Sequence, residues 1–253
     1  IKRDRTVGCL IVYLEAQYQA TSDHVQRMVD MYRDHLDLHW CCLPMSLSNG
    51  VSNSEPRWIA WEEGREDIWV REMPADATTT NTPGYDWYQP GMEFEEFVIA
   101  WADWYAQGEP VACFVGIRAD ESLNRFRTIA LWDKEMRDGK RWTTRVVGDV
   151  YNIYPIYDWR TADIWRYHNV SPDKPSNPIY DLMHKAGVPL SQQRLCQPFG
   201  HDQRKGLWLY HILEPHTWFK LIARVNGANS GAFYIQERGN INGYGAVTKP
   251  DGH

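Results

Sequence analysis

The sequence predicts an α/β protein with a mainly parallel sheet and helices on both faces. Residues 9–14, 38–43 and 111–117 are short, almost wholly apolar runs, which is the composition of strands buried on both faces. Between the first two runs, apolar residues recur at helical spacing over residues 24–36. A strand–helix–strand unit this short implies a right-handed parallel crossover.

The remaining elements follow from the same patterns. Thr21, Ser22 or Asp23 can cap the first helix, and a second helix over 94–105 ends at Gly108. A strand is expected over 151–156, and further helices are expected over residues 122–136, 161–167, 178–185, 208–213 and 216–225. Residues 44–91 lack periodicity but are rich in aromatic residues, which indicates an irregular packed insertion or lid.

Composition sets the broad class. The 253 residues, of which 43% are hydrophobic, suffice for one large domain, assigned to residues 1–245 with a tail over 246–253. The net charge of −6 excludes a global basic field, so nucleic acid would need a local patch. The apolar runs are too short to span a membrane, and no signal-peptide pattern opens the chain. The five scattered cysteines are typical of a reduced, cytoplasmic protein.

The first candidate site follows the strand over 111–117. Seven polar or charged side chains occupy ten positions there, namely Arg118, Asp120, Glu121, Ser122, Asn124, Arg125 and Arg127. Ligands of open α/β sheets bind beyond the carboxyl ends of the strands, and guanidinium groups match phosphate oxygens in charge and geometry. The same residues are also typical of a solvated helix start. Glu15, at the end of another predicted strand, is either a nucleotide contact or a solvent-facing loop acid.

A second candidate site lies within residues 194–206. Gly200 precedes polar residues that open a helix, and Arg204 and Lys205 add positive charge, which favours an anion. Cys196 is either a nucleophile or sulfur carrier activated by these cations, or a small buried hydrophobic residue. Since no second pair of ligands stands at zinc spacing, no metal site is predicted from these residues.

The segment GIRADES, residues 116–122, resembles the arginine motif of the phosphoadenosine-phosphosulfate (PAPS) reductase-like family. That family belongs to the adenine-nucleotide α-hydrolase, or PP-loop ATP pyrophosphatase, superfamily. Later segments resemble the same family in the same order, namely YPIYDW (154–159), TADIW (161–165) and NPIYDL (177–182). Two further segments resemble a narrower branch of the family, related to a bacterial prophage co-activator; they are LSQQRLCQPFGHDQRKGLWLYHILEP and ARVNGANSGA. The resemblance runs from about residue 7 to about residue 245.

The resemblance implies an adenine-nucleotide α-hydrolase-like fold that binds ATP or an adenylated sulfur nucleotide with Mg²⁺. The implied chemistry is cleavage between the α- and β-phosphates with adenylation of an acceptor. Arg118 would hold the phosphates and Glu121 would orient the arginines, with Cys196 as sulfur carrier. The remaining implied contacts are Glu15, Gly116, Ser122, Arg125, Arg127, Arg204 and Lys205.

Two departures from the family pattern limit this expectation. The sequence contains no PP-loop of the Ser-Gly-Gly-Lys-Asp-Ser type. In the family this loop comes before the strand that residues 9–14 match, so its residues would precede Ile1. The chain is therefore either truncated, as its non-Met start favours, or a relative that has lost nucleotide cleavage. The carboxyl-terminal cysteine of true PAPS reductases is also missing, which argues against sulfate reduction.

The alternative function is a non-catalytic regulatory module that acts with a ParB-like partner on DNA, as the co-activator branch implies. An enzyme of DNA sulfur modification lies between the two. The acceptor and the oligomeric state, including a homo-oligomer, stay open.

Overall fold

The protein has a mixed α/β fold with a parallel sheet and several helices, as the sequence predicts. The computed structural model describes residues 6–131, 133–171, 173–200 and 206–229. The chain forms two compact units, and each is described by itself. The first unit combines Ile1–Glu93 with Asn177–His253, and the second is the continuous stretch Phe94–Ser176.

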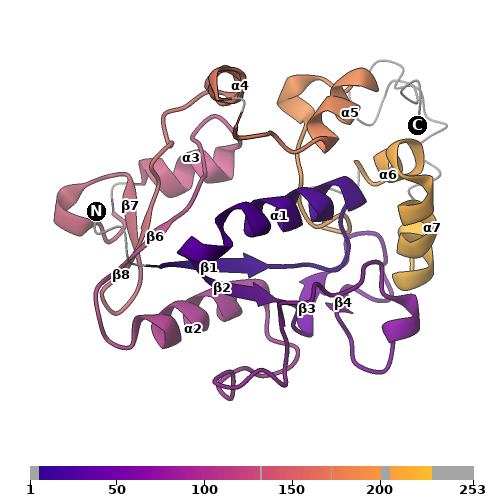
Figure 1. The fold of residues 1–253 in the computed structure, drawn as a ribbon, viewed down its shortest axis with the longest axis horizontal. Coiled ribbons are helices and arrows are strands. Elements are labelled where there is room, and N and C mark those ends of the chain that lie inside the picture. The colour runs from indigo at the N-terminus through magenta and orange to yellow at the C-terminus, as the bar shows by residue number, and fades with distance from the viewer. Residues whose placement is uncertain (1–5, 132, 172, 201–205, 230–253) are drawn as a thin grey trace. The chain divides into compact units, whose positions relative to one another are not determined.

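The first unit contains the predicted parallel crossover. Strand β1 (Val7–Val12) pairs in parallel with β2 (Leu36–Cys41), and helix α1 (Gln19–Tyr32) connects them. Figure 1 shows α1 lying along this sheet. A short strand, β5 (Ala77–Thr78), extends the sheet in parallel beside β2. The carboxyl ends of β2 and β5 therefore open at the same edge.

The aromatic-rich insertion contains regular structure that its lack of periodicity did not predict. Strands β3 (Met45–Ser48) and β4 (Arg57–Ala60) form an antiparallel pair, and a short 3₁₀ helix covers Glu66–Ile68. These strands have four residues each, too few for an alternating pattern to stand out. Trp58 and Trp61 are buried, which confirms the expectation of a packed rather than disordered segment.

The carboxyl-terminal part of the first unit is helical. Its helices are α5 (Ile179–Lys185), α6 (Trp208–Leu213) and α7 (Pro215–Arg224), with a 3₁₀ turn at Leu190–Gln192. Buried residues of these helices share one hydrophobic core with buried residues of the amino-terminal part, such as Trp40 and Trp61. The first unit is therefore closed by segments from both ends of the chain.

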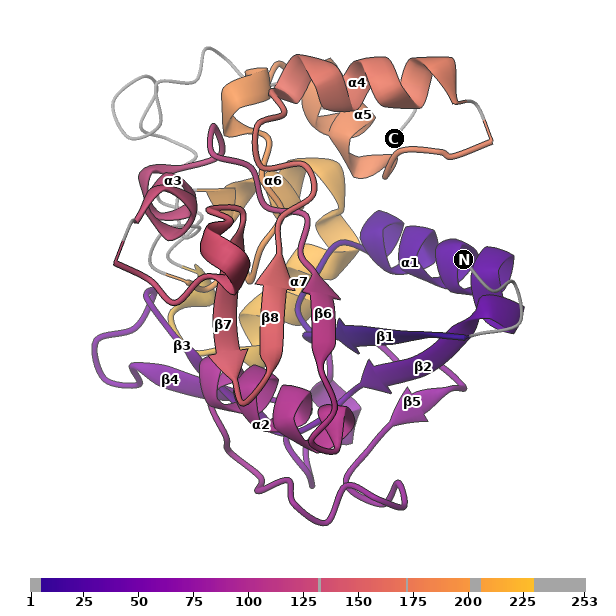
Figure 2. The same cartoon turned by 90° about the vertical axis from the view of Figure 1, so that its left-hand side faces the viewer.

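The second unit holds a three-stranded sheet with order β6–β8–β7, visible face-on in Figure 2. Strand β8 (Val150–Ile153) lies between the parallel β6 (Val111–Phe114) and the antiparallel β7 (Thr143–Val147). Ala102 and Ala106 of helix α2 (Phe94–Ala106) pack with Val150 in a small core. Helices α3 (Leu123–Ala130) and α4 (Thr161–Val170) begin after β6 and β8, and a 3₁₀ turn covers Arg137–Gly139.

Two predicted helix ends differ from the structure. The helix expected over 122–136 ends at Ala130, and Lys134 instead donates to the carbonyl oxygens of Thr128, Ile129 and Arg141. Helix α1 begins at Gln19, ahead of the predicted caps, because a distant carboxylate binds its first amides. Tertiary contacts outweigh local capping signals at both positions.

Candidate functional site

The predicted arginine motif forms a loop at the carboxyl end of β6, called here the arginine loop (residues 116–122). Arg118 is the central side chain and is only 12% exposed. Its Nη1 donates to Asp120 Oδ1, and its Nε lies 3.5 Å from Glu121 Oε1. Glu121 thus lies beside Arg118, and its role in orienting the arginines stays a prediction. Two carboxylates hold the guanidinium in a fixed direction, which lowers the entropy lost when it binds a ligand.

The arginine loop is tied to the end of the neighbouring strand. The backbone N–H of Ala119 donates to the carbonyl oxygen of Tyr157 at 2.8 Å, just beyond β8. Asp120 Oδ2 accepts from the backbone N–H of Thr161, the first residue of α4, at 3.1 Å. Since β6 and β8 are parallel, the loop and the start of α4 lie at one edge of the sheet. This is where α/β folds place their ligands.

The other predicted residues of the arginine loop differ in their surroundings. Ser122 caps α3, because its Oγ accepts from the backbone N–H of Arg125 at 3.2 Å. Arg125 and Arg127 are exposed on α3. A Cβ at Gly116 would meet only Ile156 Cδ1 at 3.8 Å, an ordinary contact, so no close approach within the chain requires glycine there. The nucleotide contacts assigned to these residues stay predictions.

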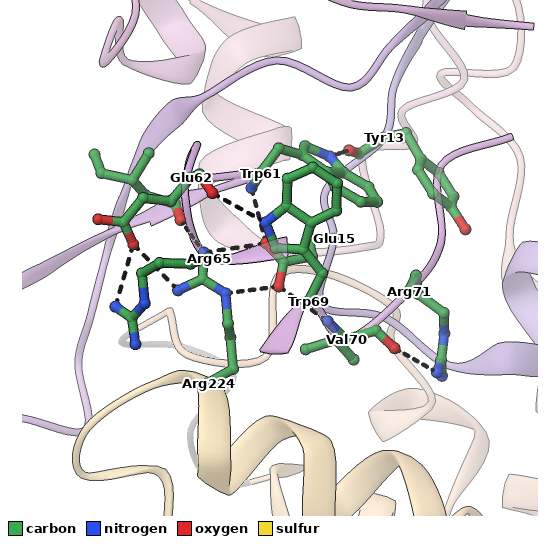
Figure 3. A network of polar contacts seen from close by, with 10 residues as sticks. Tyr13, Glu15, Trp61, Glu62, Arg65, Trp69, Val70, Arg71 and Arg224 are labelled. Carbon is green, nitrogen blue, oxygen red and sulfur yellow. Dashed lines mark hydrogen bonds and ion pairs between the residues drawn. The ribbon is translucent and has the colours of Figure 1, made fainter. Parts of the chain in front are cut away.

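Glu15 is fully buried in the first unit, and the chain itself binds both of its carboxylate oxygens. The backbone N–H groups of Trp61 and Val70 donate to it at 2.8 and 3.0 Å. Arg224 adds two further hydrogen bonds, from Nε at 2.8 Å and Nη2 at 3.2 Å. Figure 3 shows the carboxylate enclosed by these donors. A solvent-facing loop acid, the simpler expectation, is thereby wrong, and contact with a nucleotide stays a prediction.

Arg224 is the residue of this network that sequence reasoning missed. It is also buried, donates to the carbonyl oxygen of Ile59 at 2.6 Å and lies over the ring of Trp58 at 5.4 Å. Trp61 adopts a positive φ of 51°, rare for a large side chain, and the same residue presents its N–H to Glu15. The sequence feature that could have pointed to Arg224 is the ARVNGANSGA stretch of the family resemblance, which contains it.

A second polar contact set lies close by in the first unit. Arg71, also buried, donates to the carbonyl oxygen of Gln17 at 2.7 Å and to Glu214 at 3.2 Å. Glu214 in turn accepts from the backbone N–H groups of Gln19 and Ala20, the first residues of α1. This carboxylate therefore satisfies amide donors at the start of α1, where it also complements the helix dipole.

The second predicted site is described only in part. Cys196 is exposed, so the buried hydrophobic alternative is wrong, and its proposed role as sulfur carrier stays a prediction. Nearby, Gln197 donates to the carbonyl oxygen of Ser48 and Phe199 packs against Trp58, which anchors this segment to the β3–β4 pair. Arg204 and Lys205 lie outside the described residues.

Two family models match consecutive parts of the chain. Residues 76–186 match the model of the phosphoadenosine phosphosulfate reductase domain. This match supports the PAPS reductase-like family. Residues 187–253 match a domain of unknown function, DUF3440. The arginine loop falls inside the first match, whereas Cys196 and Arg224 fall inside the second. None of these matches bears on the prophage co-activator branch, which stays a prediction.

The chain is similar to a curated bacterial protein. It is 43% identical over 250 residues to the uncharacterized protein YbdN of Escherichia coli (strain K12). The match covers 98% of this chain and 61% of that protein, so the chain spans about three fifths of its relative's length. No solved structure matches the chain.

The described residues show neither a membrane-spanning helix nor a metal-binding cluster. Within the ranges that the structure describes, no helix has the length and apolarity needed to cross a membrane. Among the same residues, no three His, Cys, Asp or Glu side chains are grouped so that they could hold a metal ion.

Proposed function

We propose that this protein binds an adenylated nucleotide, ATP or an adenylated sulfur nucleotide, and that Arg118 contacts its phosphate or sulfate group. The observation that carries the proposal is the fixed Arg118 guanidinium at the carboxyl edge of the parallel strands β6 and β8, inside the PAPS reductase match. We further propose that ATP, when it is the bound nucleotide, is cleaved between its α- and β-phosphates: an acceptor oxygen attacks the α-phosphorus and becomes adenylated, and pyrophosphate leaves.

The hydrogen bonding of Arg118 supports a role in anion binding. Its Nη1 and Nε face Asp120, Thr161 and Glu121. Its Nη2 makes no hydrogen bond to the residues that the structure describes, and one charged donor group is therefore left for a ligand oxygen. A fixed charged donor of this kind contributes more than a mobile surface arginine, because its side chain is already ordered.

The arginine loop does not fit Mg²⁺. Both oxygens of Asp120 are used within the chain, by Arg118 and by the backbone N–H of Thr161. Glu121 points its Oε1 at the same guanidinium. A cation here would have to displace Arg118 from its partners, so no step is assigned to a metal at this loop.

The test is calorimetric titration of the protein with ATP, adenosine 5′-phosphosulfate and PAPS. At least one should bind, and Arg118→Ala should weaken its binding by roughly 10- to 100-fold, the value of a charge-assisted hydrogen bond. Arg137→Ala is the matched control, because Arg137 is an arginine of the same unit that is paired with Asp149 away from the loop.

Failure of all three nucleotides to bind would overturn the proposal, as would equal affinities for wild type and Arg118→Ala. Thermal unfolding of Arg118→Ala separates lost binding from lost folding. Pyrophosphate release from bound ATP then tests the cleavage step. Binding without turnover would support instead the regulatory module that acts with a ParB-like partner on DNA.

A further inference from the structure

The first unit contains a pocket of about 400 Å³ that the nucleotide proposal does not use. It lies where β2 and β5 end, because Cys42 and Pro44 follow β2, and Thr79 follows β5. Its lining is Cys42, Pro44, Trp61, Glu63, Glu66, Trp69, Met73, Thr79, Thr80 and Asn81. Its volume is that of a small-molecule site, and its place at the strand ends is where such sites form.

Two indole rings line the pocket, and Trp69 supplies its accessible aromatic surface, because Trp61 is only 1% exposed and packs behind it. Trp61 and Trp69 have ring centroids 5.1 Å apart and planes at 87°. Each indole N–H already donates to a backbone carbonyl oxygen, that of Tyr13 for Trp61 and that of Glu62 for Trp69. The rings therefore offer a ligand apolar and π-electron surface rather than a hydrogen-bond donor. Met73 adds a further apolar group.

The charge of the lining is negative. Among the described residues of the lining, Glu63 and Glu66 are the only charged ones, and none is a lysine, arginine or histidine. Glu63 Oε1 accepts from the Thr80 hydroxyl at 3.1 Å, and Glu66 Oε1 accepts from the backbone N–H of Gly64 at 2.8 Å. That backbone hydrogen bond lowers the pKa of Glu66, which keeps the carboxylate ionised near neutral pH.

The arginine within the same segment does not cancel this charge. Between Glu62 and Asp67 the chain carries four acids and one arginine, Arg65. Arg65 pairs with Glu62 at 3.2 Å, and Glu62 is not part of the lining. The two carboxylates of the pocket thus keep their charge toward whatever enters it. A phosphate would be repelled here, which separates this pocket from a nucleotide phosphate site.

We propose that this pocket binds a small organic cation, an ammonium group with an apolar body. The aromatic surface of Trp69 attracts a cation through the ring quadrupole, and Glu63 and Glu66 attract it by charge. The apolar body fills the space against Met73. The inference is independent of nucleotide binding, because its residues lie outside the arginine loop.

The experiment compares choline with its uncharged isostere 3,3-dimethylbutan-1-ol, on the full chain, by tryptophan fluorescence and ligand-observed NMR. Choline should bind at least tenfold more tightly, because the two molecules share size and shape but only one is charged. The double variant Glu63→Gln, Glu66→Gln should lose about tenfold in choline affinity, and Trp69→Leu should lose a similar factor. Glu72→Gln is the matched control, since Glu72 is an exposed acid outside the lining.

Equal binding of choline and its isostere would overturn the proposal, and so would absence of binding by both. Unchanged affinity in the Glu63→Gln, Glu66→Gln variant would overturn it as well. Nucleotide titration of the same variant distinguishes the two proposals. It should bind nucleotide as wild type does, while Arg118→Ala should keep its affinity for choline.

Discussion

Two arginines of this protein face carboxylates in different ways. Arg224 in the first unit is 1% exposed and faces Glu15, which is 0% exposed. Backbone groups of Trp61, Val70 and Ile59 surround the pair, and Arg224 also contacts the Glu62 carboxylate at 3.4 Å. Arg118 in the second unit is 12% exposed and faces Asp120, which is 38% exposed. The first pair is closed inside a core, and the second lies at an open strand edge.

The difference separates stability from binding. Both oxygens of Glu15 are hydrogen-bonded within the chain, so the pair contributes to the stability of the first unit. The Arg118 pair leaves Nη2 without a hydrogen bond to the described residues, which is the basis of the binding role proposed above. An arginine paired with a carboxylate can thus serve stability or binding, and its burial indicates which.

The largest expected effect is on the closed pair. Arg224→Met should lower the free energy of unfolding by about 3–5 kcal/mol, because it leaves the Glu15 charge buried without its partner. Arg118→Ala should lower it by no more than about 1 kcal/mol. Urea denaturation monitored by tryptophan fluorescence measures both.

A double variant sharpens this test. Glu15→Gln combined with Arg224→Met removes both charges and should cost less than the sum of the single changes. If Arg224→Met were no more destabilising than Arg118→Ala, the distinction between a closed and an open pair would be wrong.

The next effect concerns the loop that follows Arg224. Gly227 has φ +88°, and a Cβ there would lie 2.3 Å from the carbonyl oxygen of Val51. Gly227→Ala should therefore cost about 1–3 kcal/mol from the clash. A further 1–2 kcal/mol, roughly, should come from the left-handed backbone.

Gly91→Ala is the matched control, because Gly91 has the same φ of +88° but nothing within 4 Å of its Cβ position. Chemical denaturation of the two variants should differ by the clash alone. Equal decreases in the free energy of unfolding would show that the Val51 backbone moves aside freely. The close contact between Gly227 and Val51 would then not contribute to the stability of the region around Arg224.

The smallest effect tests how apolar the interior of the first unit is. Burial raises the pKa of Cys41 from 9.0 to about 12. The folded state therefore holds a proton that the unfolded state releases, so stability is complete below pH 9 and falls as pH rises toward 12. The decline should be about 1.4 kcal/mol per pH unit for this thiol.

Urea denaturation at pH 8.5, 9.5 and 10.5 measures this slope, and Cys41→Ala should reduce it by that amount. Cys113→Ala is the comparison in the second unit, where Cys113 is only partly buried. A slope unchanged by Cys41→Ala would mean that water reaches the end of β2.

The sequence was sufficient for the parts of the fold that depend on periodicity. The crossover from β1 through α1 to β2 follows from two apolar runs and a helical pattern, and helix α6 has the predicted bounds of 208–213. The arginine loop could be placed because Arg118 follows a recognisable apolar strand. The expectation that this strand is buried on both faces is wrong, since Phe114 of β6 is 73% exposed. Each of these signals lies within a few neighbouring residues.

The missing parts depend on contacts between distant residues. Glu214 binds the first amides of α1 across 195 and 194 positions, so local capping residues gave the wrong helix start. Arg224 reaches Glu15 across 209 positions, and nothing near Glu15 in the sequence indicates a partner. The acidic pocket was missed for the same reason, since its lining residues come from three separate segments of the chain, within 42–44, 61–73 and 79–81.

The division of the first unit into two stretches also determines when that unit can finish folding during synthesis. After the ribosome has incorporated Glu15, it must add 209 more residues to reach Arg224, which takes roughly 10–40 s at ordinary elongation rates. Throughout that interval the nascent chain carries an acid destined for an apolar interior without its counter-charge. The second unit is a single stretch and meets no such delay.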